Sequence, residues 1–103
     1  MSAVPSTYGY AVLDNLGRNG WSLYARTGQM VHRMLFTSRH LAEDQSPRDR
    51  AVAELAGLGW KVRGDGSWYI QAWTGAPAGT SWVAIEPIDT PEADAVRRQR
   101  GAW

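Results

Sequence analysis

Length, composition and charge narrow the class of this protein before any motif is considered. The chain has 103 residues and a net charge of +1, which is typical of one domain with a modest core. It has no cysteine, so disulfides and thiolate metal sites are excluded and a reducing compartment is expected. No apolar run approaches the ~20 residues that span a membrane, and the first ten residues lack the pattern of a signal peptide. We therefore expect one cytoplasmic domain, residues 1–103, without membrane contact.

Aromatic content and charge distribution both favour a binding role. Six tryptophans are many for this length, and each can bury about 150–250 Å². No acidic residue lies between Asp14 and Glu43, whereas four arginines do. Such asymmetry marks an anion-binding face or complementary self-association, unless the acidic second half neutralises it in the fold. Lys61 is the only lysine, and this excess of arginine is typical of GC-rich bacterial and phage genomes.

Residues 1–7 are predicted to be a flexible lead-in, and residues 8–37 the first of two α-β-β units. The stretch AVLDNLGRNGW from Ala11 resembles AVAELAGLGW from Ala51 if one inserted residue is allowed. Both stretches end in Gly-Trp and lead into a short alternating run. Because a lone helix and hairpin cannot bury both apolar faces, two copies would pack together. Chance similarity in Ala- and Gly-rich sequence is the alternative.

Residues 29–44 leave two interpretations open. Alternation predicts a strand through about Thr37 and then a short helical turn, with Tyr24, Arg26 and Arg33 on the outer side of the sheet. Several apolar residues of this stretch also fit a 3.6-residue period, so one helix from Gln29 to Asp44 is the competitor. We prefer the strand.

Residues 47–73 are predicted to be the second unit, and they carry the clearest local signals. Ser46 is a good N-cap, Pro47 suits the first helical position, and Asp49 completes a capping box. Glycines at 57 and 59 would end this helix. The alternating runs on both sides of Gly64-Asp65-Gly66 predict a β-hairpin over residues 60–73. A three-residue loop would point Trp60, Val62, Trp68, Ile70 and Ala72 inward and Lys61, Arg63, Tyr69, Gln71 and Trp73 outward.

Residues 81–100 are predicted to be a strand followed by a C-terminal helix. The strand covers Ser81–Glu86 and is stopped by Pro87, while Thr90-Pro91 is a cap-then-proline helix start. Together the segments predict an α+β fold, in which an antiparallel sheet of about five strands has two to three helices mainly on one face.

The order of signals in residues 50–72 resembles a known family. A helix, Gly59-Trp60, a strand, a turn, Gly66-Ser67 and a second strand follow one another as in the core of HicA-type RNA-cleaving toxins. Those toxins have a double-stranded-RNA-binding-like fold and a catalytic histidine just after the Gly-Ser. Trp68 stands at that position here. The resemblance therefore implies a related helix–hairpin architecture without the cleavage chemistry.

The sequence contains no recognisable catalytic or metal-binding motif. His32 and His40 are the only histidines, and their separation fits neither one helical face nor a common zinc spacing. The nucleophile elbow, the phosphate-binding loop with lysine and the dinucleotide fingerprint are all missing. We expect no cofactor, no metal and no enzymatic activity. An enzyme would have to use His32 or His40 as its acid–base group.

Two binding functions remain. The first is a small regulatory or accessory protein whose sheet face binds a protein partner or a second copy. Trp, Tyr and Arg are enriched in interface hot spots, and this face would carry Tyr69, Gln71, Trp73, Lys61 and Arg63. The alternative is a nucleic-acid-binding regulator that uses the basic segment 18–40 and the hairpin 60–73. Its residues would be Tyr24, Arg26, Arg33 and Arg39, because cations neutralise phosphates and aromatic rings stack on bases. The near-neutral charge weighs against it.

Overall fold

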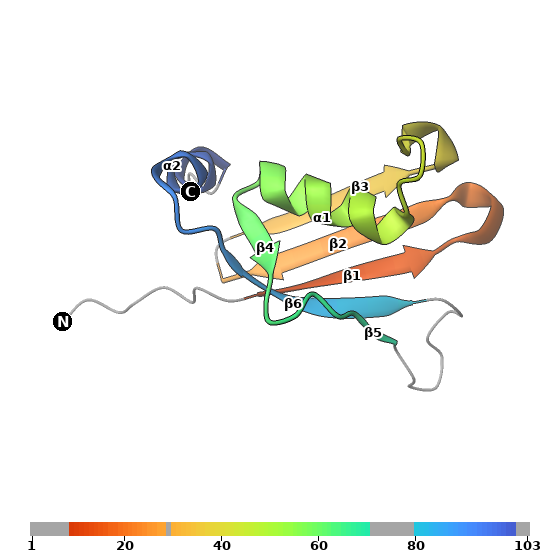
Figure 1. Cartoon of the computed structure of the whole chain (residues 1–103), viewed down its shortest axis with the longest axis horizontal. Helices are drawn as coiled ribbons and strands as arrows, with labels where there is room; N and C mark the ends of the chain where they lie inside the picture. Colours follow the sequence, from red (N-terminus) through yellow and green to blue (C-terminus); the bar gives the residue numbers. More distant parts are fainter. Residues whose placement is uncertain (1–8, 29, 71–79, 101–103) are drawn as a thin grey trace.

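The protein is an α+β domain in which two helices accompany an antiparallel sheet, as expected (Figure 1). The computed structural model describes residues 9–28, 30–70 and 80–100. The sheet has the order β3-β2-β1-β6-β4, and β5 also pairs with β6. The strands are β1 (Gly9–Asn15), β2 (Trp21–Thr27), β3 (Val31–Phe36), β4 (Trp60–Val62), β5 (Tyr69–Ile70) and β6 (Ser81–Pro87). The helices are α1 (Pro47–Gly57) and α2 (Pro91–Arg100), with the short 3₁₀ turns η1 (Gly17–Asn19) and η2 (Ser38–His40).

Helix α1 begins where the sequence predicts. The Ser46 hydroxyl accepts a hydrogen bond from the Asp49 N–H at 3.0 Å, and the Asp49 carboxylate accepts from the Ser46 N–H at 3.2 Å. Each side chain thereby satisfies a backbone donor that has no partner inside the helix. Gly57 is the last helical residue, and Gly59 takes the left-handed conformation with φ +90°. Ala51 and Leu55 are buried against the sheet, which makes α1 the cover of one sheet face.

The first predicted helix is wrong. Residues 9–15 form strand β1, so the N-terminal unit contains three strands and no α-helix before the Gly-Trp pair. Ala11 and Leu13 are buried at a spacing of two, and β2 and β6 flank β1 on its two sides. Hydrogen bonding to both neighbours satisfies the backbone without a helix. Tertiary pairing therefore overrides the helical tendency of this Ala- and Leu-containing stretch.

Of the two interpretations of residues 29–44, the strand followed by a short turn is confirmed. Strand β3 ends at Phe36 and leads into η2, so the long helix is wrong. Phe36 is buried and stacks on Trp21 with 5.6 Å between ring centroids. Val31 and Leu35 are exposed on the opposite side, as the alternation predicts. Gln29 lies outside the described residues.

The predicted hairpin over residues 60–73 is also wrong in its described part. β4 and β5 do not pair with each other; both pair antiparallel with β6, so they run in the same direction along it. β4 takes positions 85–87 of β6 and β5 takes positions 81–82. The Gly64-Asp65-Gly66 turn therefore forms a loop within an interrupted edge strand and does not reverse the chain. A long unpaired edge on β6 outcompetes pairing between two short segments because its backbone groups also need partners.

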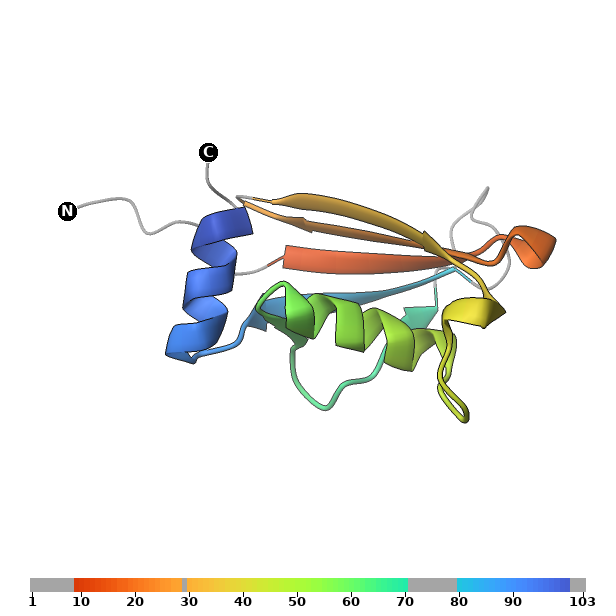
Figure 2. The ribbon, with the colours of Figure 1, turned by 90° about the horizontal axis from the view of Figure 1, so that it is seen from above.

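The C-terminal strand and helix are confirmed, and α2 is attached to the sheet by one arginine. The Thr90 hydroxyl caps α2 by accepting from the Ala93 N–H at 3.1 Å. Arg97 donates to the backbone oxygens of Gly59 and Ile88, and its guanidinium lies 5.9 Å from the Trp60 ring centroid. Figure 2 shows α2 crossing the end of the sheet while α1 lies along one face. Among the described residues no helix is long and apolar enough to cross a membrane.

Candidate binding face

The two faces of the sheet differ in what covers them. One, the inner face, packs on α1 and contains the buried residues Leu23, Ala25, Phe36, Val83 and Ile85. The alternate residues of the same strands project to the other side, which we call the open face. None of the described side chains on the open face is buried, and Tyr69 is 57% exposed. Because successive side chains of a strand point to opposite sides, this division follows directly from the register.

Strand register aligns five side chains into one row across the open face. Tyr69 is the cross-strand neighbour of Trp82, Trp82 of Val12, Val12 of Tyr24, and Tyr24 of Arg33. Five different strands contribute, and with about 4.8 Å between strands the row extends over about 19 Å. We call these five residues the aromatic row. They lie up to 70 positions apart in the chain, and only the assembled sheet brings them together.

The rings of this face pack against their neighbours. Tyr69 stacks on Trp82 with 4.8 Å between centroids and 27° between planes. Tyr10 lies beside Tyr24 at 6.2 Å in a tilted arrangement. The Arg33 guanidinium lies 5.1 Å from the Tyr24 ring centroid, within the range of a cation–π contact. These contacts hold the rings in place before any partner arrives, which lowers the entropy that binding would cost.

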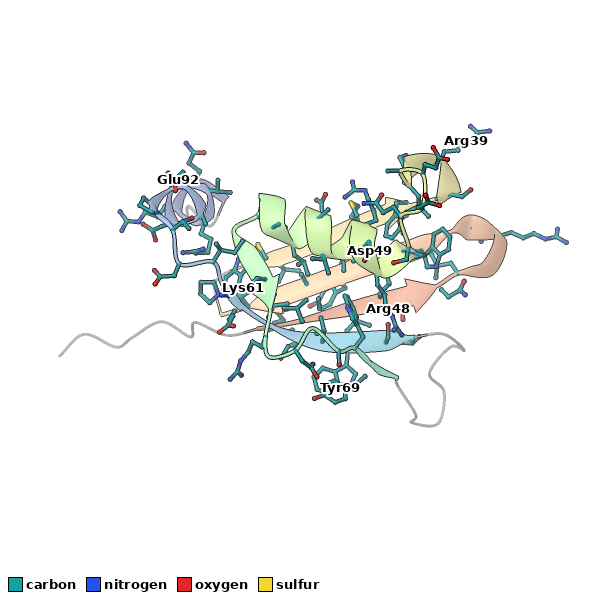
Figure 3. All side chains as sticks on the ribbon, viewed as in Figure 1. Arg39, Arg48, Asp49, Lys61, Tyr69 and Glu92 are labelled. Atoms are coloured by element: carbon teal, nitrogen blue, oxygen red, sulfur yellow. The ribbon has the colours of Figure 1, made fainter. Side chains whose placement is uncertain are left out.

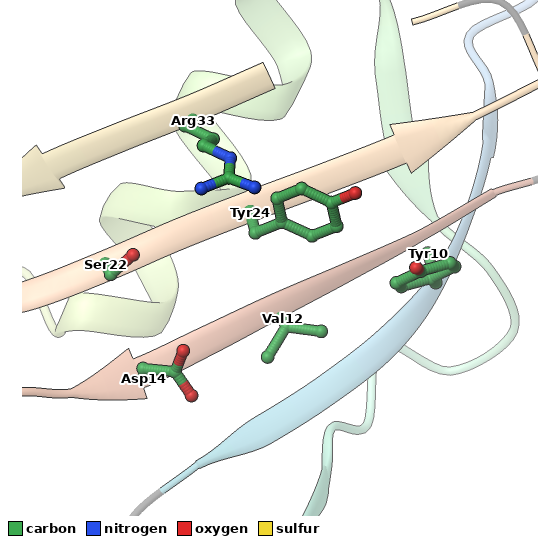
Figure 4. A pocket seen from close by; sticks show the side chains of 6 residues that line it. All are labelled: Tyr10, Val12, Asp14, Ser22, Tyr24 and Arg33. Atoms are coloured by element: carbon green, nitrogen blue, oxygen red, sulfur yellow. The ribbon is translucent and has the colours of Figure 1, made fainter. Parts of the chain in front are cut away.

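A shallow hollow lies in the middle of the open face, with a volume of about 410 Å³. Figure 4 shows it from the open side, with α1 behind the sheet. Arg33 lies at one side of the hollow, and Asp14 at the other accepts a hydrogen bond from the Thr80 hydroxyl at 2.8 Å. Its walls therefore combine apolar and aromatic side chains with one cation and one anion, and the lining residues are Tyr10, Val12, Asp14, Ser22, Tyr24 and Arg33.

The structure brings the two predicted residue sets onto the same face. Arg26 pairs with Tyr10 in the row next to the aromatic row, so it joins Tyr24 and Arg33. At the opposite end of the strand order from β3, Lys61 of β4 lies opposite Glu86. The Arg63 N–H, just after β4, donates to Ala84 O at 2.9 Å. Tyr69, Lys61 and Arg63 of the first set thus share a surface with Tyr24, Arg26 and Arg33 of the second.

Three predicted residues do not join this surface in the described structure. Arg39 lies on η2, far from Tyr69 (Figure 3). Gln71 and Trp73 lie outside the described residues. Conversely, Tyr10 and Val12 are not among the predicted site residues, because the α-β-β unit predicted for residues 8–37 would begin with a helix. The alternation of Tyr10, Val12 and Asp14 with buried Ala11 and Leu13 was the available signal.

Both histidines support local structure. His32 Nε2 lies 2.9 Å from Glu54 Oε2 and connects β3 to α1. His40 Nδ1 accepts a hydrogen bond from the Thr37 N–H at 3.0 Å within η2. No group of three or more metal-binding side chains exists in the described ranges. The histidines are therefore not brought together with each other or with the open face.

One carboxyl group has a shifted pKa. The Ser67 backbone N–H donates to Asp65 Oδ1 at 2.9 Å, and this bond to the charged form lowers the pKa of Asp65 below its ordinary value. The interaction closes the turn that leads the chain from β4 toward Tyr69. The Asp65–Ser67 hydrogen bond therefore affects the open face only by shaping the turn that precedes Tyr69.

Comparison of the chain with protein-family models, with curated proteins and with solved structures finds no match. The resemblance of residues 50–72 to HicA-type toxins accordingly stays a prediction.

Proposed function

We propose that this chain is a small, non-enzymatic, cytoplasmic regulatory or accessory protein that binds a protein partner through its open face. The observation that carries the proposal is the aromatic row, which joins Tyr69, Trp82 and Tyr24 across the sheet. Large rigid aromatic side chains with a neighbouring arginine are the residue types that dominate the energy of protein interfaces. A hollow beside them offers space for an apolar side chain of the partner.

The packing of the rings favours a protein over a nucleic acid. A base needs an uncovered ring face on which to stack. Stacking of Tyr69 on Trp82 occupies one face of each of these rings, and Arg33 occupies one face of Tyr24. The same face carries exposed Val31 and Leu35, whose aliphatic side chains neither neutralise phosphates nor provide a ring for stacking. These aliphatic groups suit an apolar protein surface.

Nucleic acid is the second candidate, because Arg26 and Arg33 share the face with Tyr24. Light-scattering mass, measured with mixed RNA and DNA fragments at two salt concentrations, separates the candidates. Binding dominated by phosphate contacts weakens steeply as salt rises. We expect no gain of mass at moderate salt. A complex that forms at low salt and dissociates as salt rises would contradict binding of a protein partner and support nucleic-acid binding as the function.

A display library of random peptides provides the positive test. Peptides retained by the wild-type protein should bind the Trp82→Ala variant at least ~10-fold more weakly than they bind wild type. A decrease of this size corresponds to the loss of one hot-spot contact. Val52→Ala, an exposed apolar truncation on α1, is the matched control and should keep the pool. A pool that ignores Trp82→Ala, or no retained pool at all, would contradict the proposal.

A further inference from the structure

Among the described strands, β3 ends the sheet on the side away from β4 and β5. Its open-face residues are Val31, Arg33 and Leu35, and the two aliphatic ones are 59% and 72% exposed. Edge strands in proteins are usually shielded by charges, proline or a covering segment, because they attract further strands. Here Arg33 is the only charged residue among the three that project to the open face. Two exposed aliphatic side chains on an edge strand favour contact with another chain.

The hydrogen-bond pattern shows which backbone groups of β3 point outward. The Thr27 N–H donates to Met30 O at 2.9 Å and closes the turn between β2 and β3. In an antiparallel ladder, hydrogen-bonded pairs alternate with non-hydrogen-bonded pairs. Register then directs the backbone groups of residues 32, 34 and 36 toward β2. The N–H and C=O groups of Val31, Arg33 and Leu35 point away from β2. An added strand would therefore find donors and acceptors on the same residues whose side chains face the open side.

The other side of this edge has a polar wall. Glu54 of α1 lies 2.9 Å from His32 and 3.3 Å from Arg50, and Arg50 donates to the Met34 sulfur at 3.8 Å. All three polar side chains of this wall are about a quarter exposed or less. Side chains of an added strand that point to this side would meet polar groups. Those that point to the open side would meet Val31, Arg33 and Leu35.

The charge of the β3 edge disfavours pairing with the β3 strand of a second copy of this chain. No acid lies between Asp14 and Glu43, and register places Arg26 next to Val31 and Arg33 next to Tyr24. Pairing two β3 edges about Arg33 would bring the arginines of both copies opposite each other on the open face, while Glu54 at this edge lies on the other face and contacts His32. Like charges that approach across strands are destabilising. An acidic segment would instead complement Arg33.

We propose that the partner contributes an extended segment that pairs with β3 as an additional strand. Its open-face positions carry an acidic residue opposite Arg33 and apolar residues opposite Val31 and Leu35, and polar residues lie between them. The pattern is apolar–polar–acidic–polar–apolar. This inference rests on the proposed function in that the partner is a protein, but it depends on the backbone edge of β3 and on Arg33, and not on the aromatic rings of the aromatic row.

The test uses the same display library with a charge exchange. We expect the retained peptides to be enriched in the pattern above. A synthetic capped peptide, Thr-Val-Thr-Glu-Thr-Val-Thr, represents the pattern, and the same peptide with lysine at its centre reverses the charge. Arg33→Glu should weaken binding of the glutamate peptide at least ~10-fold and should prefer the lysine peptide. Arg39→Glu, with the same charge change on η2, should keep the wild-type preference. Retained peptides without the pattern, or an unchanged preference in Arg33→Glu, would overturn the proposal.

Backbone pairing has its own readout. N-methylation of the peptide at alternate residues removes its donors toward β3 and should abolish binding, while methylation at the other residues should not. Amide exchange of Val31, Arg33 and Leu35 should slow in the complex. Equal binding of both methylated peptides would overturn strand addition. A light-scattering dimer that Leu35→Glu dissociates would do the same, because the edge would then be occupied by a second copy. A retained pool that depends on Trp82 but ignores every change at β3 overturns this inference and leaves the proposed function intact.

Discussion

The inner and open faces of the sheet are built from alternate residues of the same strands, and they differ in how closely their side chains are packed. Leu23 and Ile85 of the inner face and Leu55 of α1, which packs on it, are completely buried. On the open face, aromatic rings touch each other but remain partly accessible, and Arg33 lies over the ring of Tyr24. Stability should therefore depend on the first face and binding on the second. The predictions below test that separation.

The largest effect is expected where α1 packs on the inner face. Leu55→Ala removes a fully buried side chain from α1 and should lower the free energy of unfolding by about 2–5 kcal/mol, through lost burial and the cavity left behind. Urea denaturation measures the change. Val52→Ala on the same helix is the control, because Val52 is 37% exposed and its truncation should cost less than about 1 kcal/mol. Equal costs at the two positions would show that α1 is not packed on the sheet as described.

A smaller loss is expected at Gly20, which directly precedes β2. Its φ is +87°, and a Cβ there would lie 2.2 Å from Phe36 O, so alanine forces apart the strands that hold Trp21 on Phe36. Gly20→Ala should cost about 1–3 kcal/mol. Gly64→Ala is the control, since φ is +68° there but nothing lies within 4 Å of the added Cβ. Thermal unfolding should place Gly20→Ala below Gly64→Ala. The reverse order would contradict the close approach at Gly20.

The elements that the sequence predicts correctly depend on local signals. Ser46 and Asp49 at α1, and Thr90 at α2, satisfy helix-end N–H groups of residues within three positions, so both helix starts can be predicted without the rest of the fold. Alternation likewise assigns the faces of β2, β3 and β6. The helix starts depend on hydrogen bonds between residues close in the chain, and the strand faces depend on a pattern that repeats every two residues.

The segments whose predicted structure is wrong depend on pairing with residues that lie far away in the chain. β1 pairs with β6 from some 70 residues away as well as with the neighbouring β2, and residues 60–70 follow β6 because its edge is available. The aromatic row has the same origin. Tyr24 and Tyr69 are recognisable as surface aromatics, but their alignment through Val12 and Trp82 depends on the register of five strands. Local patterns therefore predict the components of the candidate face and not their assembly.

On the open face, truncation should affect binding more than folding. Tyr69→Ala removes the ring stacked on Trp82 and should cost about 0.5–1.5 kcal/mol of stability, the usual value of an aromatic pair. Binding of the selected peptide pool should still fall at least ~10-fold. Urea denaturation and peptide titration of the same sample check both values. A stability loss as large as that of Leu55→Ala would erase the distinction between the two faces.

The smallest effect is expected at the turn that leads toward Tyr69. The pKa of Asp65 lies below its ordinary value of 3.8 because the Ser67 N–H donates to the carboxylate. A lowered folded-state pKa stabilises the protein above the unfolded value, and this contribution disappears as the pH falls through the folded one. The small stability advantage of wild type over Asp65→Ala should therefore be present at about pH 6 and shrink below about pH 4. Thermal unfolding across this range measures it, and an advantage that grows toward low pH would contradict the assignment. Because this turn leads only into β5, the rates of amide hydrogen exchange in Asp65→Ala should change near Ser67 and Tyr69 and stay constant at Leu55.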